Sequence, residues 1–379
     1  MKYKFSNKKL EPLYFLVVFF IIFGSLGYKM GTPNMLNTLM NTAYSLLIDT
    51  VFYIMGISVL SGALGKMLEE FGVVGALEKL LRPLMKPLWN LPGVAALGGV
   101  LTFLSDNPAI ITLAKDRNFS KYFKKYQLIS ITNFGTSFGM GLIVIVFMAG
   151  RGYSGPALIG FAGAFIGSVI STRLAQRFIL KARPDFIEDA VLQNEEIDEE
   201  IKIDKASEEG VLLRILNSLL DGGKSGVELG LAIIPGVITI STFVMMFTFG
   251  PGENGFTGAA YEGIGLLPAF AEKMGFIFEW LFGFTNTELI AFPMTAMGAV
   301  GAALGLVPSF QESGLIDGNA IAVFTAMGMC WSGYLSTDTA MLDSLGYREL
   351  TPKTILAHTI GGLCAGVIAH WLFVVVNLF

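Results

Sequence analysis

The chain has 379 residues, of which 53% are hydrophobic and only 15% are charged. Soluble domains carry about 25% charged residues, so this composition and a mean hydropathy of +0.63 exclude an ordinary soluble protein. The apolar stretches are continuous and long enough to span a bilayer as helices, and they lack the alternating pattern of outer-membrane barrel strands. We therefore predict an all-α polytopic membrane protein.

Seven apolar spans are predicted in chain order, at 13–27, 44–64, 126–148, 155–178, 227–249, 320–342 and 354–376. Lys and Arg residues gather before the first span and at 66–86, 115–125 and 173–224. Loops rich in these residues face the cytoplasm. We therefore expect a multi-pass protein of the bacterial inner (cytoplasmic) membrane with its amino terminus inside.

Two further apolar segments do not fit as simple spans. Both flanks of 72–114 are basic, so this segment is predicted to enter and leave on the cytoplasmic side, with 72–89 going in and 92–114 coming out. The flanks of 266–306 carry no Lys or Arg, which predicts a hairpin from the outside formed by 266–282 and 288–306. Two re-entrant hairpins of opposite orientation indicate inverted-topology repeats.

This pattern divides the chain into four parts. We predict an N-terminal membrane helix at 1–43, a first repeat at 44–180, an acidic cytoplasmic linker at 181–217 and a second, inverted repeat at 218–379. The linker is rich in Asp and Glu and poor in apolar residues, which is typical of a solvated connection. A regulatory or cation-sensing loop is the alternative.

The first predicted hairpin contains the polar stretch Ser105-Asp106-Asn107, followed by Pro108. Proline favours the first turn of a helix, and Asp106 or Asn107 can cap that helix. A carboxylate within apolar membrane sequence is costly and usually faces a site or water. We predict contact with a solute or ion; a purely structural cap is the alternative.

The second hairpin contains Asn286-Thr287-Glu288 in the corresponding place. Asn286 or Thr287 can cap the helix that begins near Glu288. A glutamate at a hairpin tip inside a bilayer is expensive unless it binds a cation, a proton or a ligand hydroxyl. We predict that the acidic tips of the two hairpins meet around one cavity.

The spans that follow the hairpins are polar in matching places. Asn133 and Thr136 lie in the first, and Ser332, Thr337 and Asp338 in the second. Such residues let a helix unwind and offer oxygen atoms to Na⁺ or a solute, although close helix packing is the alternative. Candidate solute- or ion-binding residues are therefore Ser105, Asp106, Asn107, Asn133, Thr136, Asn286, Thr287, Glu288, Ser332, Thr337 and Asp338.

The remaining charged and histidine residues in the predicted membrane segments give no indication of a binding role. Asp49, Glu228, Glu272 and Glu279 are expected at interfaces or at amphipathic helix ends, and no role is assigned to them. His358 and His370 have no third metal ligand nearby, so we expect a structural hydrogen bond for each and predict no metal site.

The stretch 101–148, with Ser105-Asp106-Asn107-Pro108 and Thr132-Asn133-Phe134-Gly135, resembles the nucleoside-recognition (Gate) domain membrane proteins of bacteria. More distantly, the order of elements from 44 onward is similar to that of concentrative nucleoside transporters. That resemblance implies two opposed hairpins and unwound helices around a central solute, in a trimer. It also implies that Glu288 and Ser332 contact ribose. The Gln-Thr-Glu-like tip that reads the base in those transporters is replaced here by Ser105-Asp106-Asn107, so base recognition does not carry over.

The leading hypothesis is a secondary active transporter of a small polar solute, nucleoside-like or another metabolite, coupled to Na⁺ or H⁺ and without a cofactor. A non-transporting membrane receptor or scaffold of the same fold is the alternative. No phosphate loop, metalloprotease motif or nucleophile elbow occurs, so we predict that the chain is not an enzyme. The expected partners are the solute, the lipid bilayer and further copies of the chain, and not nucleic acid.

Overall fold

The computed structural model describes residues 10–187, 210–252 and 254–378, and it is built from helices. The central part of the predicted acidic linker, 188–209, lies outside the described residues. Six helices are long and apolar enough to cross a membrane: Glu11–Met30, Thr32–Glu70, Lys125–Gly150, Ser154–Ala182, Val211–Thr248 and Arg348–Val376. The all-helical, multi-pass class is therefore confirmed, whereas the seventh predicted span, 320–342, is divided into two shorter helices.

The helices before the linker comprise long membrane-length segments and a set of short ones. They are α1 (Glu11–Met30), α2 (Thr32–Ser45), η1 (Leu46–Val51), α3 (Phe52–Glu70), α4 (Val73–Leu84), η2 (Met85–Trp89), α5 (Ala95–Leu104), α6 (Pro108–Lys115), α7 (Arg117–Ser120), α8 (Lys125–Thr136), α9 (Gly141–Gly150), α10 (Ser154–Ala182) and η3 (Pro184–Ile187).

The helices after the linker follow a similar order, from a long helix through a short hairpin and an interrupted helix to a second long helix. They are α11 (Val211–Gly236), η4 (Val237–Ser241), α12 (Thr242–Thr248), α13 (Leu266–Ala271), η5 (Glu272–Met274), α14 (Gly275–Phe282), η6 (Thr287–Ile290), α15 (Ala291–Ala296), α16 (Val300–Leu304), α17 (Leu306–Glu312), α18 (Gly318–Cys330), α19 (Tyr334–Ser344), η7 (Arg348–Leu350) and α20 (Thr351–Val376).

The two short hairpins differ in their boundaries from those expected. The chain of the first one reverses between α5 and α6, at 105–107, so the predicted entering arm 72–89 is a separate helix, α4 with η2. The chain of the second one reverses between α15 and α16, at 297–299, and 266–282 forms α13 to α14 instead. The observed boundaries follow from Pro92-Gly93, which separates η2 from α5, and from Gly298, which lies between α15 and α16. Proline and glycine interrupt helices more strongly than polar side chains do. That either hairpin dips into a membrane without crossing it stays a prediction.

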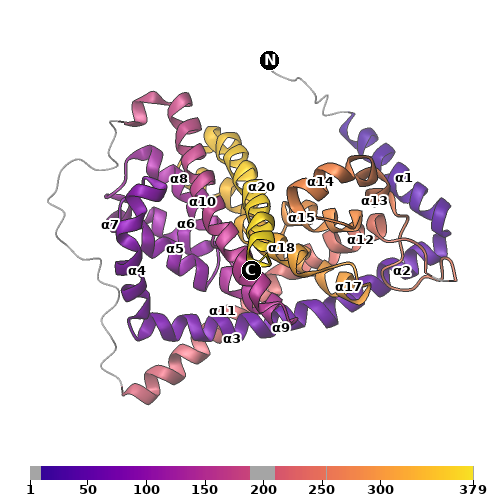
Figure 1. Ribbon diagram of the computed structural model, residues 1–379, viewed down its shortest axis with the longest axis horizontal. Coiled ribbons are helices and arrows are strands. Elements are labelled where there is room, and N and C mark those ends of the chain that lie inside the picture. The colour runs from indigo at the N-terminus through magenta and orange to yellow at the C-terminus, as the bar shows by residue number, and fades with distance from the viewer. Residues whose placement is uncertain (1–9, 188–209, 253, 379) are drawn as a thin grey trace.

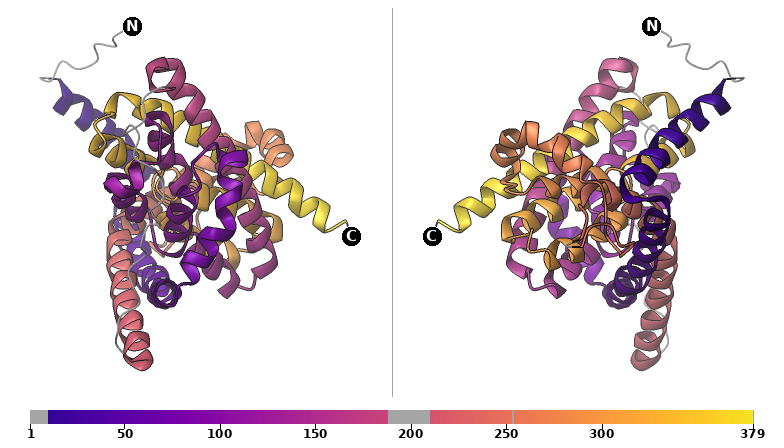
Figure 2. Two further views of the ribbon diagram at one scale, coloured as in Figure 1. Left: turned by 90° about the vertical axis from the view of Figure 1, so that its left-hand side faces the viewer. Right: turned by 90° about the vertical axis from the view of Figure 1, so that its right-hand side faces the viewer.

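Helices α10, α18 and α20 pack together in the middle of the molecule (Figure 1). Helices α4 to α8 lie on one side of them and α13 to α17 on the other, while α3 runs beneath with α11 across it. The first turns of α11 and the last turns of α20 extend beyond the body of the molecule (Figure 2).

Glycines let α3 and α11 approach so closely that their backbones touch. A Cβ atom added at Gly222 of α11 would overlap the carbonyl oxygen of Gly62 in α3, and one at Gly226 would overlap Ser58. Residue numbers along the contact rise on one helix as they fall on the other, so the two helices are antiparallel. Helices α10 and α20 also meet through small residues, where a Cβ atom at Gly167 would lie 2.5 Å from the Cβ atom of Ala365. Small residues at such contacts are how membrane helices gain packing energy.

The loop between α12 and α13 is attached to a polar stripe on α2. Asn34 and Asn41 donate to carbonyls of this loop, at 2.7 and 2.8 Å. Within the loop, Glu262 is buried and accepts hydrogen bonds from the amides of Thr257 and Gly258 at 2.9 Å each. Burial alone raises the pKa of Glu262, but these hydrogen bonds outweigh it and hold the pKa below its ordinary value. The loop therefore carries a buried negative charge that its own backbone stabilises.

The α3–α11 contact predicts different effects of alanine at two neighbouring glycines. Gly222→Ala places a methyl group against the Gly62 carbonyl and is expected to destabilise the fold by about 1–3 kcal/mol. Gly223→Ala is the matched control, because its Cβ atom would meet Val59 at an ordinary 3.6 Å. Thermal unfolding of the purified protein in one detergent measures both. Equal melting temperatures for the two variants would contradict the close crossing.

Candidate functional site

Four interruptions of helices lie near one another at the centre of the fold. They are the turn between α5 and α6, the break between α8 and α9, the turn between α15 and α16, and the break between α18 and α19, at 105–107, 137–140, 297–299 and 331–333. Interrupted helices leave backbone groups without helical partners. The surrounding residues must therefore supply hydrogen-bond partners for these backbone groups.

Three of the interruptions are joined by one serine. The Ser332 hydroxyl donates to the carbonyl oxygen of Thr136, the last residue of α8, at 2.8 Å. The same hydroxyl lies 3.4 Å from Oδ1 of Asn107 in the first hairpin turn. The predicted site residues Asn107, Thr136 and Ser332 are thus brought together.

Two glycines make room for the side chain of Asn107. A Cβ atom at Gly139 would overlap both Asn107 Oδ1 and Ser332 Oγ, and one at Gly333 would lie 2.7 Å from Asn107 Cγ and 2.5 Å from Thr337 Oγ1. Glycine in each break therefore lets the hairpin turn enter the gap between the interrupted helices. Thr337 is placed beside this contact.

The remaining interruption, the turn at 297–299, contacts the carboxyl-terminal end of α18, where the break at 331–333 begins. A Cβ atom at Gly328, in the last turn of α18, would lie 3.2 Å from Val300, the first residue after the second hairpin turn. The turn also faces α11, where a Cβ atom at Gly236 would lie 3.4 Å from Ala299. Sequence reasoning missed this turn because Met297-Gly298-Ala299 is apolar, like the helices on either side of it. Pro293 and Gly298 were the available signals.

The second polar stretch lies at the opposite end of α18. The Asn286 side chain donates to the carbonyl of Leu315, shortly before α18 begins, at 2.9 Å. Helix α18 has 13 residues, and a helix of that length extends about 20 Å. The expectation that the two acidic stretches meet is therefore corrected: Asn286, Thr287 and Glu288 start the second hairpin and do not form its turn. Their role in binding stays a prediction.

Neither polar stretch caps its helix as expected. Asn107 and Asn286 occupy the positions before α6 and η6, but neither side chain bonds to the helix amides. Asn107 Nδ2 instead donates to Asp106 Oδ1 at 2.8 Å. The amide side chains are used for tertiary contacts, which a local sequence pattern does not reveal.

Two predicted site residues point away from the hairpin turns, into the packing of α8, α10, α19 and α20. Asn133 donates to Ser171 Oγ and to the Thr354 carbonyl at 3.1 and 3.0 Å. Asp338 is fully buried, and its Oδ2 lies 3.2 Å from Nδ1 of His358. Asn133 thus joins three helices, as the packing alternative predicts. His358 makes the structural hydrogen bond expected of it.

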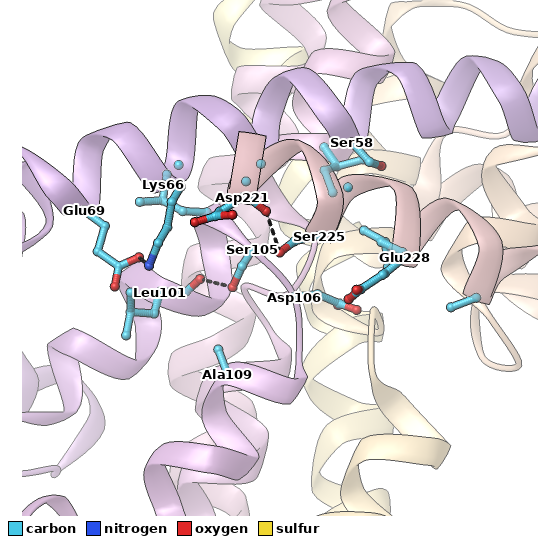
Figure 3. A pocket seen from close by; sticks show the side chains of 18 residues that line it. Ser58, Lys66, Glu69, Leu101, Ser105, Asp106, Ala109, Asp221, Ser225 and Glu228 are labelled. Carbon is cyan, nitrogen blue, oxygen red and sulfur yellow. Dashed lines mark hydrogen bonds and ion pairs between the residues drawn. The ribbon is translucent and has the colours of Figure 1, made fainter. Parts of the chain in front are cut away.

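A cavity of about 510 Å³ lies between the first hairpin turn and the α3–α11 pair. Its polar lining consists mainly of oxygen acceptors and hydroxyls, at Ser58, Glu69, Ser105, Asp106, Asp221, Ser225 and Glu228, together with Lys66. Figure 3 shows Glu228 extending from α11 toward the side chain of Asp106. Sequence analysis missed Glu228, although a carboxylate in an apolar helix was the signal.

Two of the cavity carboxylates have no cationic partner in the described part of the chain. Lys66 pairs with Glu69 at 2.9 Å, and Asp221 pairs with Lys224 at 3.3 Å. Asp106 accepts from the side-chain amide of its neighbour Asn107 at 2.8 Å, and no described cation pairs with Asp106 or Glu228. The cavity therefore presents negative charge on both of its walls.

Cross-linking can separate the observed arrangement from the one first expected. In a chain whose native cysteines Cys330 and Cys364 are replaced by serine, Asn107→Cys with Ser332→Cys should cross-link through a short bis-thiol reagent, because the two side chains touch. Asn107→Cys with Asn286→Cys is the control and should not cross-link, because α18 separates them by about 20 Å. Mass-spectrometric detection of the second product but not the first would contradict the structure.

Comparison with known proteins agrees with this architecture. Residues 15–152 match the Gate family, described as nucleoside recognition. Curated protein sequences include no significant match to the chain. Among solved structures, a doubly substituted CNTnw in an outward-facing state has a TM-score of 0.55 at 12% identity, over 97% of this chain and 86% of that one. CNTnw in an inward-facing substrate-bound state has a TM-score of 0.54 at 13% identity, over 93% of this chain and 90% of that one.

CNTnw is a concentrative nucleoside transporter, and such proteins are transporters rather than enzymes. The resemblance found in the sequence is thus confirmed over residues 15–152, and that the chain is not an enzyme stays a prediction. Residues 15–152 match the Gate nucleoside-recognition family, and the chain as a whole has a fold similar to that of a concentrative nucleoside transporter.

Proposed function

We propose that the protein is a secondary active transporter that carries a small polar solute across the bacterial inner membrane, with its amino terminus in the cytoplasm. The observation that supports this most is the place of the cavity. One wall is the rigid α3–α11 pair, and the other is the turn between α5 and α6. The similarity in fold to CNTnw adds support.

The lining suggests the chemistry of the solute. Carboxylates and hydroxyls dominate it, so a solute that offers several hydroxyl or amino donors is matched best. A volume of about 510 Å³ falls within the range of about 300–1,000 Å³ of small-molecule pockets. A nucleoside meets both conditions, through its sugar hydroxyls and its base amino group.

Transport requires the cavity to open alternately to the two sides. The α3–α11 pair is closely packed, whereas the first hairpin turn is held by Asn107 and Ser332 to the interrupted helices. Movement of the hairpins and interrupted helices as a body past α3 and α11 would change which side the cavity faces. Na⁺ or H⁺ bound near Asp106 and Glu228 would neutralise charge that is otherwise uncompensated there. Helices α3 and α11 are antiparallel, and so are α10 and α20, where Gly163 lies against Ala369 and Gly167 against Ala365. Inverted repeats predict such antiparallel pairs.

Uptake by proteoliposomes tests the proposal directly. Radiolabelled uridine and adenosine are the probes, with an imposed Na⁺ or H⁺ gradient. Asp106→Asn is expected to lower gradient-driven uptake about tenfold or more, because a hydrogen bond to a charged group contributes about 1.5–3 kcal/mol.

Asp116→Asn is the control for that substitution. Asp116 lies outside the cavity and caps α7 by accepting from the amide of Asn118 at 2.6 Å, a role that asparagine fills equally well. Uptake should therefore be unchanged in this variant. Correctly inserted protein that binds a probe without any gradient-dependent flux would overturn the proposal in favour of a receptor with the same fold.

A further inference from the structure

A buried acid–base pair lies apart from the cavity, between α19 and α20. Asp338 Oδ2 is 3.2 Å from His358 Nδ1, and both side chains are completely inaccessible to solvent. The other ring nitrogen, Nε2, bonds to the carbonyl oxygen of Cys330, the last residue of α18. Neither residue lines the cavity.

These contacts determine how many protons the pair holds. A carbonyl oxygen only accepts, so Nε2 must carry a hydrogen atom. Nδ1 faces a carboxylate, and a hydrogen bond there needs one more proton, on either the ring or the acid. The bonded pair therefore contains one proton more than a neutral histidine beside an ionised aspartate.

Loss of that proton would be costly at this place. Two lone pairs would then face each other between Nδ1 and Oδ2, and the carboxylate would lose the positive charge beside it. The second carboxylate oxygen, Asp338 Oδ1, is buried and has no hydrogen-bond partner among the described residues. An ionised carboxylate in such surroundings is stable only beside a compensating charge.

The pair is connected to the break between α18 and α19. His358 bonds to Cys330 before the break and to Asp338 after it. The indole Nε1 of Trp331, within the break, donates to the His358 carbonyl at 3.2 Å. Thr136 Oγ1, at the end of α8, lies 3.3 Å from His358 Nε2. A change in the protonation of the imidazole therefore affects both α18 and α19, the helices on either side of Ser332.

Few other titratable groups face the pair. Cys330 on α18 and Tyr334 on α19 lie against it, the latter with its ring 5.5 Å from that of His358. The α8 side chain that contacts the imidazole, Thr136, is uncharged. The carboxylate and the imidazole thus dominate the local electrostatics.

We propose that Asp338 and His358 form a proton-binding site, and that the bound proton holds the α18–α19 break in the conformation that places Ser332 against α8 and the first hairpin turn. The break is expected to be ordered while the proton is bound and to loosen as rising pH removes it. This site goes beyond the proposed transport function and does not depend on it.

Trp331 is a native reporter for the experiment. The emission of the full-length protein in detergent is recorded against pH, and the spectra of Trp331→Phe are subtracted to isolate this residue from Trp89, Trp280 and Trp371. A single transition with rising pH is expected. His358→Gln and Asp338→Asn should each abolish it, whereas His370→Gln, on the same helix but bonded to Asn319, should retain it.

Infrared spectroscopy provides a second measurement. In His358→Gln the carboxyl of Asp338 loses the imidazole, so it should take up a proton and show the carbonyl absorption of a protonated acid. That band should be absent when Asp338→Asn is added. A Trp331 signal that does not change with pH, or a transition that survives both substitutions, would overturn the proposal, as would an ionised Asp338 in His358→Gln.

Discussion

The arrangement depends on one constraint, that backbone groups released where a helix stops inside an apolar bundle must find partners within the protein. At two such ends here a side chain is a partner. Ser332 donates to the carbonyl of Thr136 at the end of α8, and His358 donates to that of Cys330 at the end of α18. Helix interruptions placed separately would each need such a set of partners. When the interruptions lie together, a side chain from one of them can bond to the free backbone group of another.

This gathering also explains the use of glycine in the two breaks. Asn107 can approach Ser332 only because Gly139 and Gly333 carry no side chains. The first hairpin turn is thereby attached to the interrupted helices on one side and borders the cavity on the other, through Ser105 and Asp106. A solute or ion in the cavity would therefore contact residues whose backbone positions depend on the breaks. These contacts would couple binding in the cavity to the geometry of the interrupted helices.

Composition and long apolar stretches were enough to predict the membrane class, whereas the arms predicted for the first hairpin, 72–89 and 92–114, place its reversal too early in the chain. Ser105-Asp106-Asn107 could be found because a polar interruption is conspicuous in apolar sequence. The second turn could not, because Met297-Gly298-Ala299 is as apolar as the helices around it. The directions of Asn133 and Asp338 also required the structure, since a sequence pattern does not tell which of several packed helices a buried side chain faces. The position of Glu228 near Asp106 (Figure 3) could not be predicted either, because it depends on how α11 packs across α3.

An experimental density map of the protein in lipid nanodiscs tests the central claim most directly, because it shows the hairpin turns and the helix breaks together. We predict continuous density in which Asn107 lies against Gly139 and Ser332, with the 297–299 turn packed at the end of α18. A map in which the 105–107 turn lies in bulk solvent, or in which α8 to α9 and α18 to α19 run as unbroken helices, would contradict the account.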